Sequence, residues 1–313
     1  MTGNPATDNP ATPATPATDP ASDADTSGFV PASSGLLGSL DTWMAANPWH
    51  PRIIPFVVYL LFLAGISFTL DWSLYTYPVL YAMQFAAVAW LLYRYRLLLP
   101  ELTLRFHWLA VPTGLGLCAA WLGLGYLMIW LAPGLFAHDG EEHYFQRMAD
   151  TSAILYGLSL GLRLAGMALL VPLFEELFIR SACLRGMHSG RKTGLALVQL
   201  AEDMPIIGDW ILHSKLGQRV RSLPGQFTEQ LRECPVGTVT AFGFAASTFI
   251  FMIHHLPRDW PGCIACAVVW CWLLWYTNRG PRKLGLGPIV WSHGITNAAL
   301  WAWCLSMGDW QFM

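Results

Sequence analysis

The residues most capable of chemistry lie in a short run, Leu169 to Arg180, that is otherwise hydrocarbon. Two adjacent carboxylates, Glu175 and Glu176, and the guanidinium of Arg180 interrupt it. A charge at bilayer depth costs on the order of a few kcal/mol, so such groups normally face a protein interior and mark function. On a helix Glu176 and Arg180 share one face and can form an ion pair. Glu175 points roughly 100° away and is left to act on another group. The alternative is a purely structural ion pair beside a spare glutamate.

Two further polar clusters interrupt apolar segments. Ser247, Phe251 and His255 follow one another at intervals of four residues, which places them on one face of a helix. His293 and Asn297 are also four residues apart and share a face. We expect these two clusters and the unpaired glutamate to surround one small site, although a lone histidine in such a segment is often structural.

This set of side chains suits the hydrolysis of a bond by activated water. Glu175, shielded from bulk water, can take a proton from a water molecule that a neighbouring histidine shares. A second histidine and an asparagine amide can donate hydrogen bonds to the oxyanion of a tetrahedral intermediate. No cofactor is firmly implied. If a metal is present, Glu175, His255 and His293 would be its ligands, in a three-ligand site suited to a divalent ion such as zinc. The His-Glu-x-x-His signature of zinc proteases does not occur.

The composition predicts an integral membrane protein. Of the 313 residues, 54% are apolar and only 12% are charged, whereas soluble domains carry roughly a quarter charged residues. The net charge of −2 gives no reason to expect a nucleic acid partner. The expected partners are the lipid bilayer and a membrane-associated protein or peptide substrate. The seven cysteines are odd in number and lie mostly in apolar runs, which predicts buried thiols and no disulfide framework.

Seven apolar segments are long enough to cross a bilayer, which takes about 20 helical residues. We therefore predict an all-α fold, a polytopic transmembrane helical bundle of about seven to eight spans, with Pro172 kinking the longest helix. The segments are 53–71, 74–93, 108–132, 153–187, 237–256, 261–278 and 286–307. Residues 1–35, rich in proline, alanine and threonine, are predicted to form a disordered tail. Residues 36–313 then form one transmembrane domain with a polar cytoplasmic insert at 188–236.

The basic residues predict the orientation in the membrane. They gather in three alternate connections, which the positive-inside rule places in the cytoplasm. They are Arg94, Arg96 and Arg105; Arg185, Arg191, Lys192, Lys215, Arg219, Arg221 and Arg232; and Arg279, Arg282 and Lys283. The amino terminus is then cytoplasmic and the carboxyl terminus is outside. Counted from the cytoplasmic helix ends, Glu175, His255 and His293 differ in depth by roughly 10 Å. We expect their common site to open toward the cytoplasmic half.

Together, the three clusters resemble the CAAX protease and bacteriocin-processing family (CPBP, or Abi) of intramembrane proteases. The motifs are Glu175-Glu176-x-x-x-Arg180, Phe251-x-x-x-His255 and His293-x-x-x-Asn297, in that order on separate apolar segments. The resemblance covers about residues 150–305. It implies a glutamate-type endopeptidase of the bacterial inner membrane that cuts membrane-tethered or lipidated proteins. A fainter likeness is to the subgroup that accompanies bacterial exosortase systems.

Carried over from the family, each motif residue has an expected role. Glu175 and His255 would activate water, His293 and Asn297 would form the oxyanion hole, and Glu176 and Arg180 would support them.

Two departures from the family pattern bear on this assignment. The insert 188–236 is longer than the usual connection. His254 beside His255 also makes the second motif ambiguous by one position, and the spacing from Ser247 and Phe251 favours His255. Two other functions use the same residues: a proton-coupled transporter with a buried Glu and His cluster, and a non-catalytic membrane partner protein.

Overall fold

The computed structural model describes residues 28–32, 34–69, 72–136, 147–189, 198, 207–215, 218 and 227–312. All seven predicted segments are helical, and the described residues contain no strand, which confirms the all-α fold. The helices are α2 (His50–Thr69), α3 (Thr76–Arg94), α4 (Ala110–Leu131), a continuous helix from Ala153 to Gly186, α13 (Ala241–Ile253), α14 (Trp260–Asn278) and α15 (Gly287–Met307).

The chain is an integral membrane protein. Within the described ranges, four helices are long and apolar enough to cross a membrane. They are His50–Thr69, Ala110–Leu131, Ala153–Gly186 and Pro257–Asn278. Helices α3 and α15 have 19 and 21 residues, and α13, with 13 residues, is a shorter apolar helix. The seven predicted spans thus all form helices, and four of them meet the length and composition of a span on their own.

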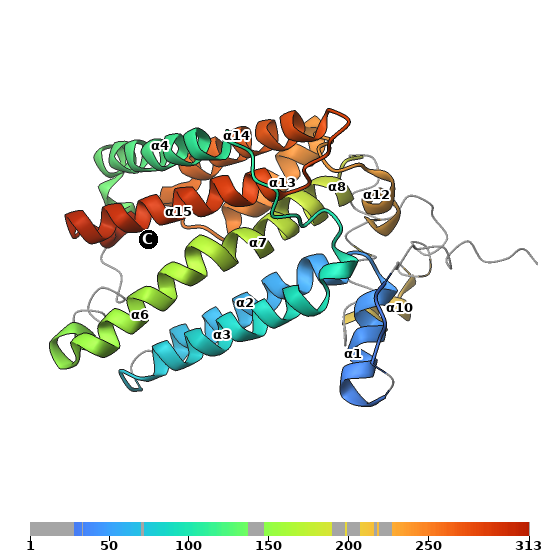
Figure 1. The fold of residues 1–313 in the computed structure, drawn as a ribbon, viewed down its shortest axis with the longest axis horizontal. Helices are drawn as coiled ribbons and strands as arrows, with labels where there is room; N and C mark the ends of the chain where they lie inside the picture. Colours follow the sequence, from blue (N-terminus) through green and yellow to red (C-terminus); the bar gives the residue numbers. More distant parts are fainter. Residues whose placement is uncertain are drawn as a thin grey trace, which may run out of the picture.

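The long helix between Ala153 and Gly186 is the centre of the bundle (Figure 1). It consists of α6 (Ala153–Ala165), the π segment η4 (Gly166–Leu170), α7 (Val171–Glu176), the π segment η5 (Leu177–Cys183) and α8 (Leu184–Gly186). On one side it packs against α13 and α15, which in turn contact α14 and α4. On its other side lies the hairpin of α2 and α3.

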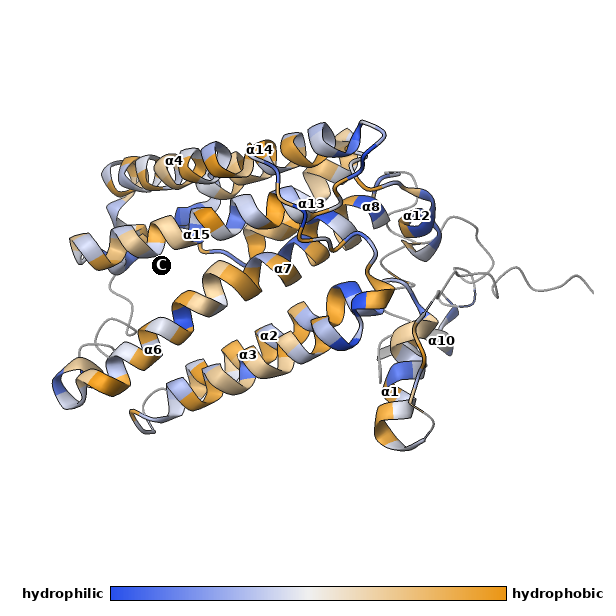
Figure 2. Ribbon diagram, viewed as in Figure 1, coloured by the Kyte–Doolittle hydropathy of each residue, from blue (hydrophilic) through white to orange (hydrophobic). Residues whose placement is uncertain are grey.

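The predicted cytoplasmic connections meet at one end of the bundle. The short helices α1 (Gly35–Ala46), α10 (Ile207–Leu212) and α12 (Phe227–Glu233) lie there, and the carboxyl terminus lies at the opposite end (Figure 1). In Figure 2 the long helices are mainly apolar, while α8 and α12 at the connection end carry hydrophilic residues. The seven cysteines are buried and free, as predicted.

Residues 28–32, which fall within the predicted disordered tail of residues 1–35, are ordered in the structure. Phe29 is buried with its ring centroid 5.7 Å from that of Tyr95, and the backbone N–H of Ala32 donates to Asp41 at 2.8 Å. Residues 28–32 are therefore packed against the bundle, although their composition resembles that of the tail. The remainder of the predicted tail, residues 1–27, and much of the insert 188–236 lie outside the described residues.

A buried ion cluster links three segments at the end of the bundle where the basic connections lie. The Glu101 carboxylate accepts hydrogen bonds from Arg52 at 2.6 and 2.8 Å and from Ser181, and the Arg185 guanidinium lies 3.5 Å away. Burial alone would raise the pKa of the Glu101 carboxyl, but the charge and hydrogen bonds of Arg52, followed by the charge of Arg185, hold it below its ordinary value. The carboxylate is therefore charged throughout the neutral range.

Glu101→Gln should destabilise the folded bundle by about 3–5 kcal/mol, because it leaves the Arg52 and Arg185 guanidinium groups buried without a counter-charge. The midpoint of thermal unfolding in detergent measures this loss. The exposed Glu233 on α12 offers a matched control, and Glu233→Gln should change stability by no more than about 0.5 kcal/mol. Since the pKa of Glu101 is lowered, its contribution is present at every pH above the ordinary value of 4.5 and is lost only as the pH falls well below it. If the difference in unfolding midpoint between wild type and Glu101→Gln disappeared between pH 7 and pH 6, this role of Glu101 would be contradicted.

Candidate active site

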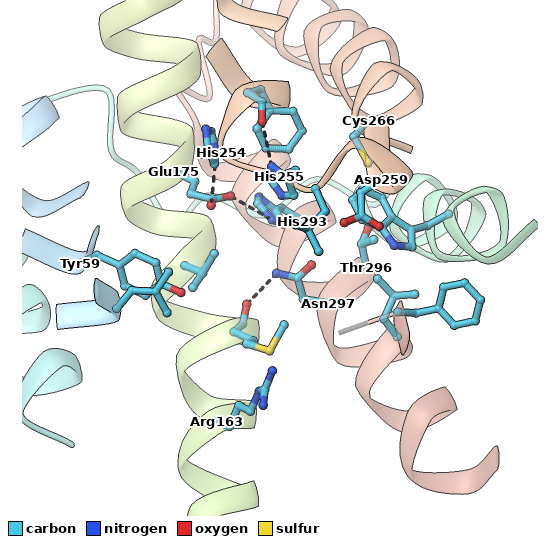
Figure 3. A pocket seen from close by; sticks show the side chains of 18 of the residues that line it. Tyr59, Arg163, Glu175, His254, His255, Asp259, Cys266, His293, Thr296 and Asn297 are labelled. Carbon is cyan, nitrogen blue, oxygen red and sulfur yellow. Dashed lines mark hydrogen bonds and ion pairs between the residues drawn. The ribbon is translucent and has the colours of Figure 1, made fainter. Parts of the chain in front are cut away.

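Three helices bring the predicted site residues to one cavity. Glu175 comes from α7, His254 and His255 directly follow α13, and His293 and Asn297 lie on α15. All five line a cavity of about 290 Å³ inside the bundle (Figure 3). Residues separated by more than a hundred positions in the chain therefore share one site.

The Glu175 carboxylate lies between two imidazoles. Its Oε2 is 3.8 Å from Nε2 of His293, and its Oε1 is 3.9 Å from Nε2 of His254 (Figure 3). The Glu175 residue is only 7% exposed. Both separations exceed a direct hydrogen bond and match the distance that one water molecule can bridge. The arrangement can therefore hold a water molecule in contact with an anionic acceptor and an imidazole.

Glu176 orients His293 as well as pairing with Arg180. Its Oε2 is 3.4 Å from Arg180 Nε, which confirms the predicted ion pair. Its Oε1 is 2.8 Å from Nδ1 of His293, a contact that the sequence did not indicate. A carboxylate held by a guanidinium only accepts hydrogen bonds, so Nδ1 of His293 carries the proton. Nε2 then faces Glu175, and the Trp270 ring stacks on the imidazole with centroids 4.3 Å apart.

Arg180 is enclosed by aromatic rings. It is 1% exposed, and its guanidinium lies 4.7 Å from the centroid of Phe251 and 5.1 Å from that of Trp270. Cation–π contacts stabilise a charge that has been removed from water. Phe251, the first residue of the second motif, thus stabilises the charge of Arg180, the last residue of the first motif. Its contribution to the site is made through Arg180.

Asn297 is held by an irregularity in the central helix. Its Nδ2 donates to the backbone carbonyl of Met167 at 2.9 Å. In the π segment, the N–H of Val171 bonds to the carbonyl five residues back, at Gly166. The same register would pair Met167 with Pro172, which has no N–H, so the Met167 carbonyl is left for Asn297. This bond fixes the amide orientation and leaves the second N–H of Asn297 on the cavity side.

Gly294 lets α15 approach the same irregular turn. A Cβ built on this glycine would lie 2.5 Å from the backbone oxygen of Ala168, which is closer than side chains tolerate. In a regular α-helix the Ala168 carbonyl would face residue 172, which is a proline and has no N–H to donate. A glycine between His293 and Asn297 therefore allows both to reach the central helix.

The two adjacent histidines face different partners. His254 donates through Nδ1 to the carbonyl of Ile250 at 2.7 Å, and its Nε2 points toward Glu175. Because a carbonyl only accepts, Nδ1 carries the proton, and the buried Nε2 has no direct hydrogen-bond partner. His255 makes the equivalent bond to Phe251 at 2.8 Å and lies 6.1 Å, centroid to centroid, from Trp121. The structure thus brings His254, and not the predicted His255, next to Glu175, although both rings line the cavity.

The residues named as metal ligands do not form a ligand set. Within the part of the chain that the structure describes, no three His, Cys, Asp or Glu side chains are placed to hold one metal ion. Glu175 and His293 are close, but His255, the third predicted ligand, has no close contact with either among the described interactions. We derive no step through a metal.

One spacing in the chain suggests a serine nucleophile, and its structural context rules against that role. Gly157-Leu158-Ser159-Leu160-Gly161 has the Gly-x-Ser-x-Gly spacing of a nucleophile elbow, which requires a sharp turn from a strand into a helix. Here the five residues lie inside α6, and Ser159 is 1% exposed and does not line the cavity. The glycines and Ser159 are therefore part of an ordinary helix, and Ser159 is not a nucleophile of this site.

Comparison with known families agrees with this geometry. Residues 157–299 match the family described as type II CAAX prenyl endopeptidase, Rce1-like. All three motifs lie within the matched range, and the match confirms the resemblance to CAAX proteases. A search of curated proteins and a search of solved structures each gave no match.

The helical fold and the family match indicate a membrane protease. The matched residues cover less than half of the 313-residue chain, and they are similar to the Rce1-like family of type II CAAX prenyl endopeptidases.

Proposed function

We propose that this chain is an intramembrane endopeptidase in which Glu175 activates a water molecule for attack on a peptide bond. The observation that carries the proposal is the position of the Glu175 carboxylate, 3.8 and 3.9 Å from two imidazoles inside a largely apolar cavity. A shielded carboxylate at one-water distance from an imidazole is a suitable general base. His254 is the imidazole that faces it, and His255, which the motif spacing favours, lines the cavity from the next position.

The reaction can be written with the groups of this chain alone. Glu175 takes a proton from water as the water oxygen bonds to the carbonyl carbon of the substrate. The resulting oxyanion accepts hydrogen bonds from the second N–H of Asn297 and from the Nε2–H of the His293 imidazolium, whose Nδ1–H is bonded to Glu176. Glu175 then passes its proton to the leaving nitrogen, the C–N bond breaks, and the products are a carboxylate and an amine.

The walls of the cavity support a substrate that is attached to the membrane. Its α2 side consists of Tyr59, Leu60, Leu63 and Ile66. Leu60 and Leu63 are 37% and 40% exposed, so this apolar wall reaches the outer face of the bundle. A lipid chain or an apolar tether could approach along that wall from the bilayer. We therefore propose a membrane-tethered or lipidated protein as substrate, as the family description indicates for its members.

We also propose that residues 36–313 form the protease domain, with the motif core at about residues 150–305. The protein would lie in the bacterial inner membrane with its amino terminus in the cytoplasm. The link to exosortase systems rests on the sequence likeness alone.

Reconstitution into proteoliposomes tests the proposed function. The purified protein should cleave some members of a panel of peptides that carry one transmembrane helix or one lipid chain, and mass spectrometry should identify a new carboxylate and a new amine. The same peptides without their anchor should be cleaved at least ten times more slowly. Equal rates on free peptides would contradict the tethered substrate. Uptake of a labelled solute without hydrolysis would favour the transporter instead.

A further inference from the structure

The cavity extends from Glu175 toward one end of the bundle. Several residues that line it lie at or beyond the ends of their helices: Ile66, Tyr77, Arg258, Asp259, Gln311 and Phe312. These positions flank the α2–α3 connection, the α13–α14 connection and the end of α15. The cavity therefore reaches the end of the bundle where the carboxyl terminus lies (Figure 1).

That end is opposite to the basic connections. Among the described residues of the connections at the carboxyl-terminal end, Asp150, Asp259 and Asp309 are acidic, and Arg147 and Arg258 are basic. The basic clusters predicted to be cytoplasmic all lie in the connections at the other end. The positive-inside rule thus places the end reached by the cavity outside the cytoplasm.

The cytoplasmic side of Glu175 is closed by packed side chains. Phe174 and Leu177 are fully buried, and Arg180, one turn further on, is 1% exposed. Beyond them lies the buried cluster of Glu101 with Arg52 and Arg185. Among the described residues, none that lines the cavity comes from a basic connection.

We infer that the site receives its substrate from the non-cytoplasmic side. This inference rests on the proposed function and adds the substrate class: the extracytoplasmic segment, next to the membrane, of a tethered protein that has been exported. The sequence favoured cytoplasmic access because residue counts place Glu175 nearer to that end. Such a count gives depth only, and the packing on either side of Glu175 decides which end is closed.

Chemical labelling of an introduced cysteine shows from which side of the membrane the cavity can be reached. Met167 lines the cavity beside Asn297. The native thiol of Cys266 lines the same cavity, so every protein in this experiment carries Cys266→Ala. A small, charged, membrane-impermeant methanethiosulfonate should modify Met167→Cys at least ten times faster in right-side-out vesicles than in inverted ones, as measured by mass shift. The Cys266→Ala protein without an introduced cysteine is the blank. Trp72→Cys, exposed in the α2–α3 connection, should label from outside, and Arg282→Cys, exposed in a basic connection, should label from inside.

The outcomes separate this inference from the proposed function. Labelling of Met167→Cys only in inverted vesicles, or in neither preparation, overturns access from outside, and so does a reversal of the two exposed controls. None of these results depends on hydrolysis. Labelling from outside in a protein that cleaves none of the tethered peptides would leave the access route intact and reject the peptidase.

Discussion

Glu175→Gln should abolish peptide hydrolysis in a protein that still folds and inserts. Glutamine has nearly the same shape as glutamate but cannot take a proton from water, so the general base is lost while the packing is retained. General-base catalysis contributes roughly 10²–10⁴-fold, and we expect kcat to fall by about 10³-fold or more. The measurement is single-turnover cleavage of a tethered peptide in proteoliposomes.

Glu175→Asp is the matched variant for this experiment. It keeps the carboxylate but withdraws it by one methylene group from His254 and His293, which it already faces at 3.9 and 3.8 Å. Its rate should therefore lie between those of wild type and Glu175→Gln. The midpoint of thermal unfolding should be similar in all three proteins. Normal turnover by Glu175→Gln would remove Glu175 from the mechanism.

The helices and the first motif could be predicted from local patterns. Apolar runs of bilayer length became helices because in a membrane the backbone must satisfy its own hydrogen bonds. The pairing of Glu176 with Arg180 follows from the geometry of one helical turn, which needs no knowledge of the fold. The same geometry turned Glu175 away from that pair and toward another partner.

The contacts between helices could not be predicted in the same way. Glu176 and His293 are 117 positions apart, and no periodicity relates them. The bond from Asn297 to Met167 depends on a π register that leaves one carbonyl without its usual partner. In the sequence, Pro172 indicates only that one backbone N–H is missing from this helix. It does not indicate which side chain donates to the unpaired carbonyl in its place.

The directions of the two adjacent histidine side chains depend on where helix α13 ends. The spacing from Ser247 and Phe251 to His255 defines a face only while the helix continues. Helix α13 ends at Ile253, and His254 has the dihedral angles φ −98° and ψ 6° of a residue beyond the regular turn. The directions of the next two side chains are then set by the turn, which sends His254 toward Glu175.

His254→Ala and His255→Ala should therefore differ in their effects on hydrolysis. Removing His254 takes away the imidazole 3.9 Å from Glu175, and we expect kcat to fall by about 10²–10⁴-fold. His255 bonds to the Phe251 carbonyl and lies near Trp121, so its removal should lower kcat by less than about tenfold and act mainly on KM.

The two variants remove the same side chain from adjacent positions, so each is the control for the other. Both should be compared at equal amounts of folded protein, with the thermal unfolding midpoint as the check. The opposite ranking would mean that His255 reaches the water during the reaction, and that the turn after α13 rearranges when substrate binds. Equal and large losses would indicate that both imidazoles share the water, which the 4.8 Å between their ring centroids permits. A dominant effect of His254 is the result expected from the structure, because helix α13 ends one residue before the imidazole that faces Glu175.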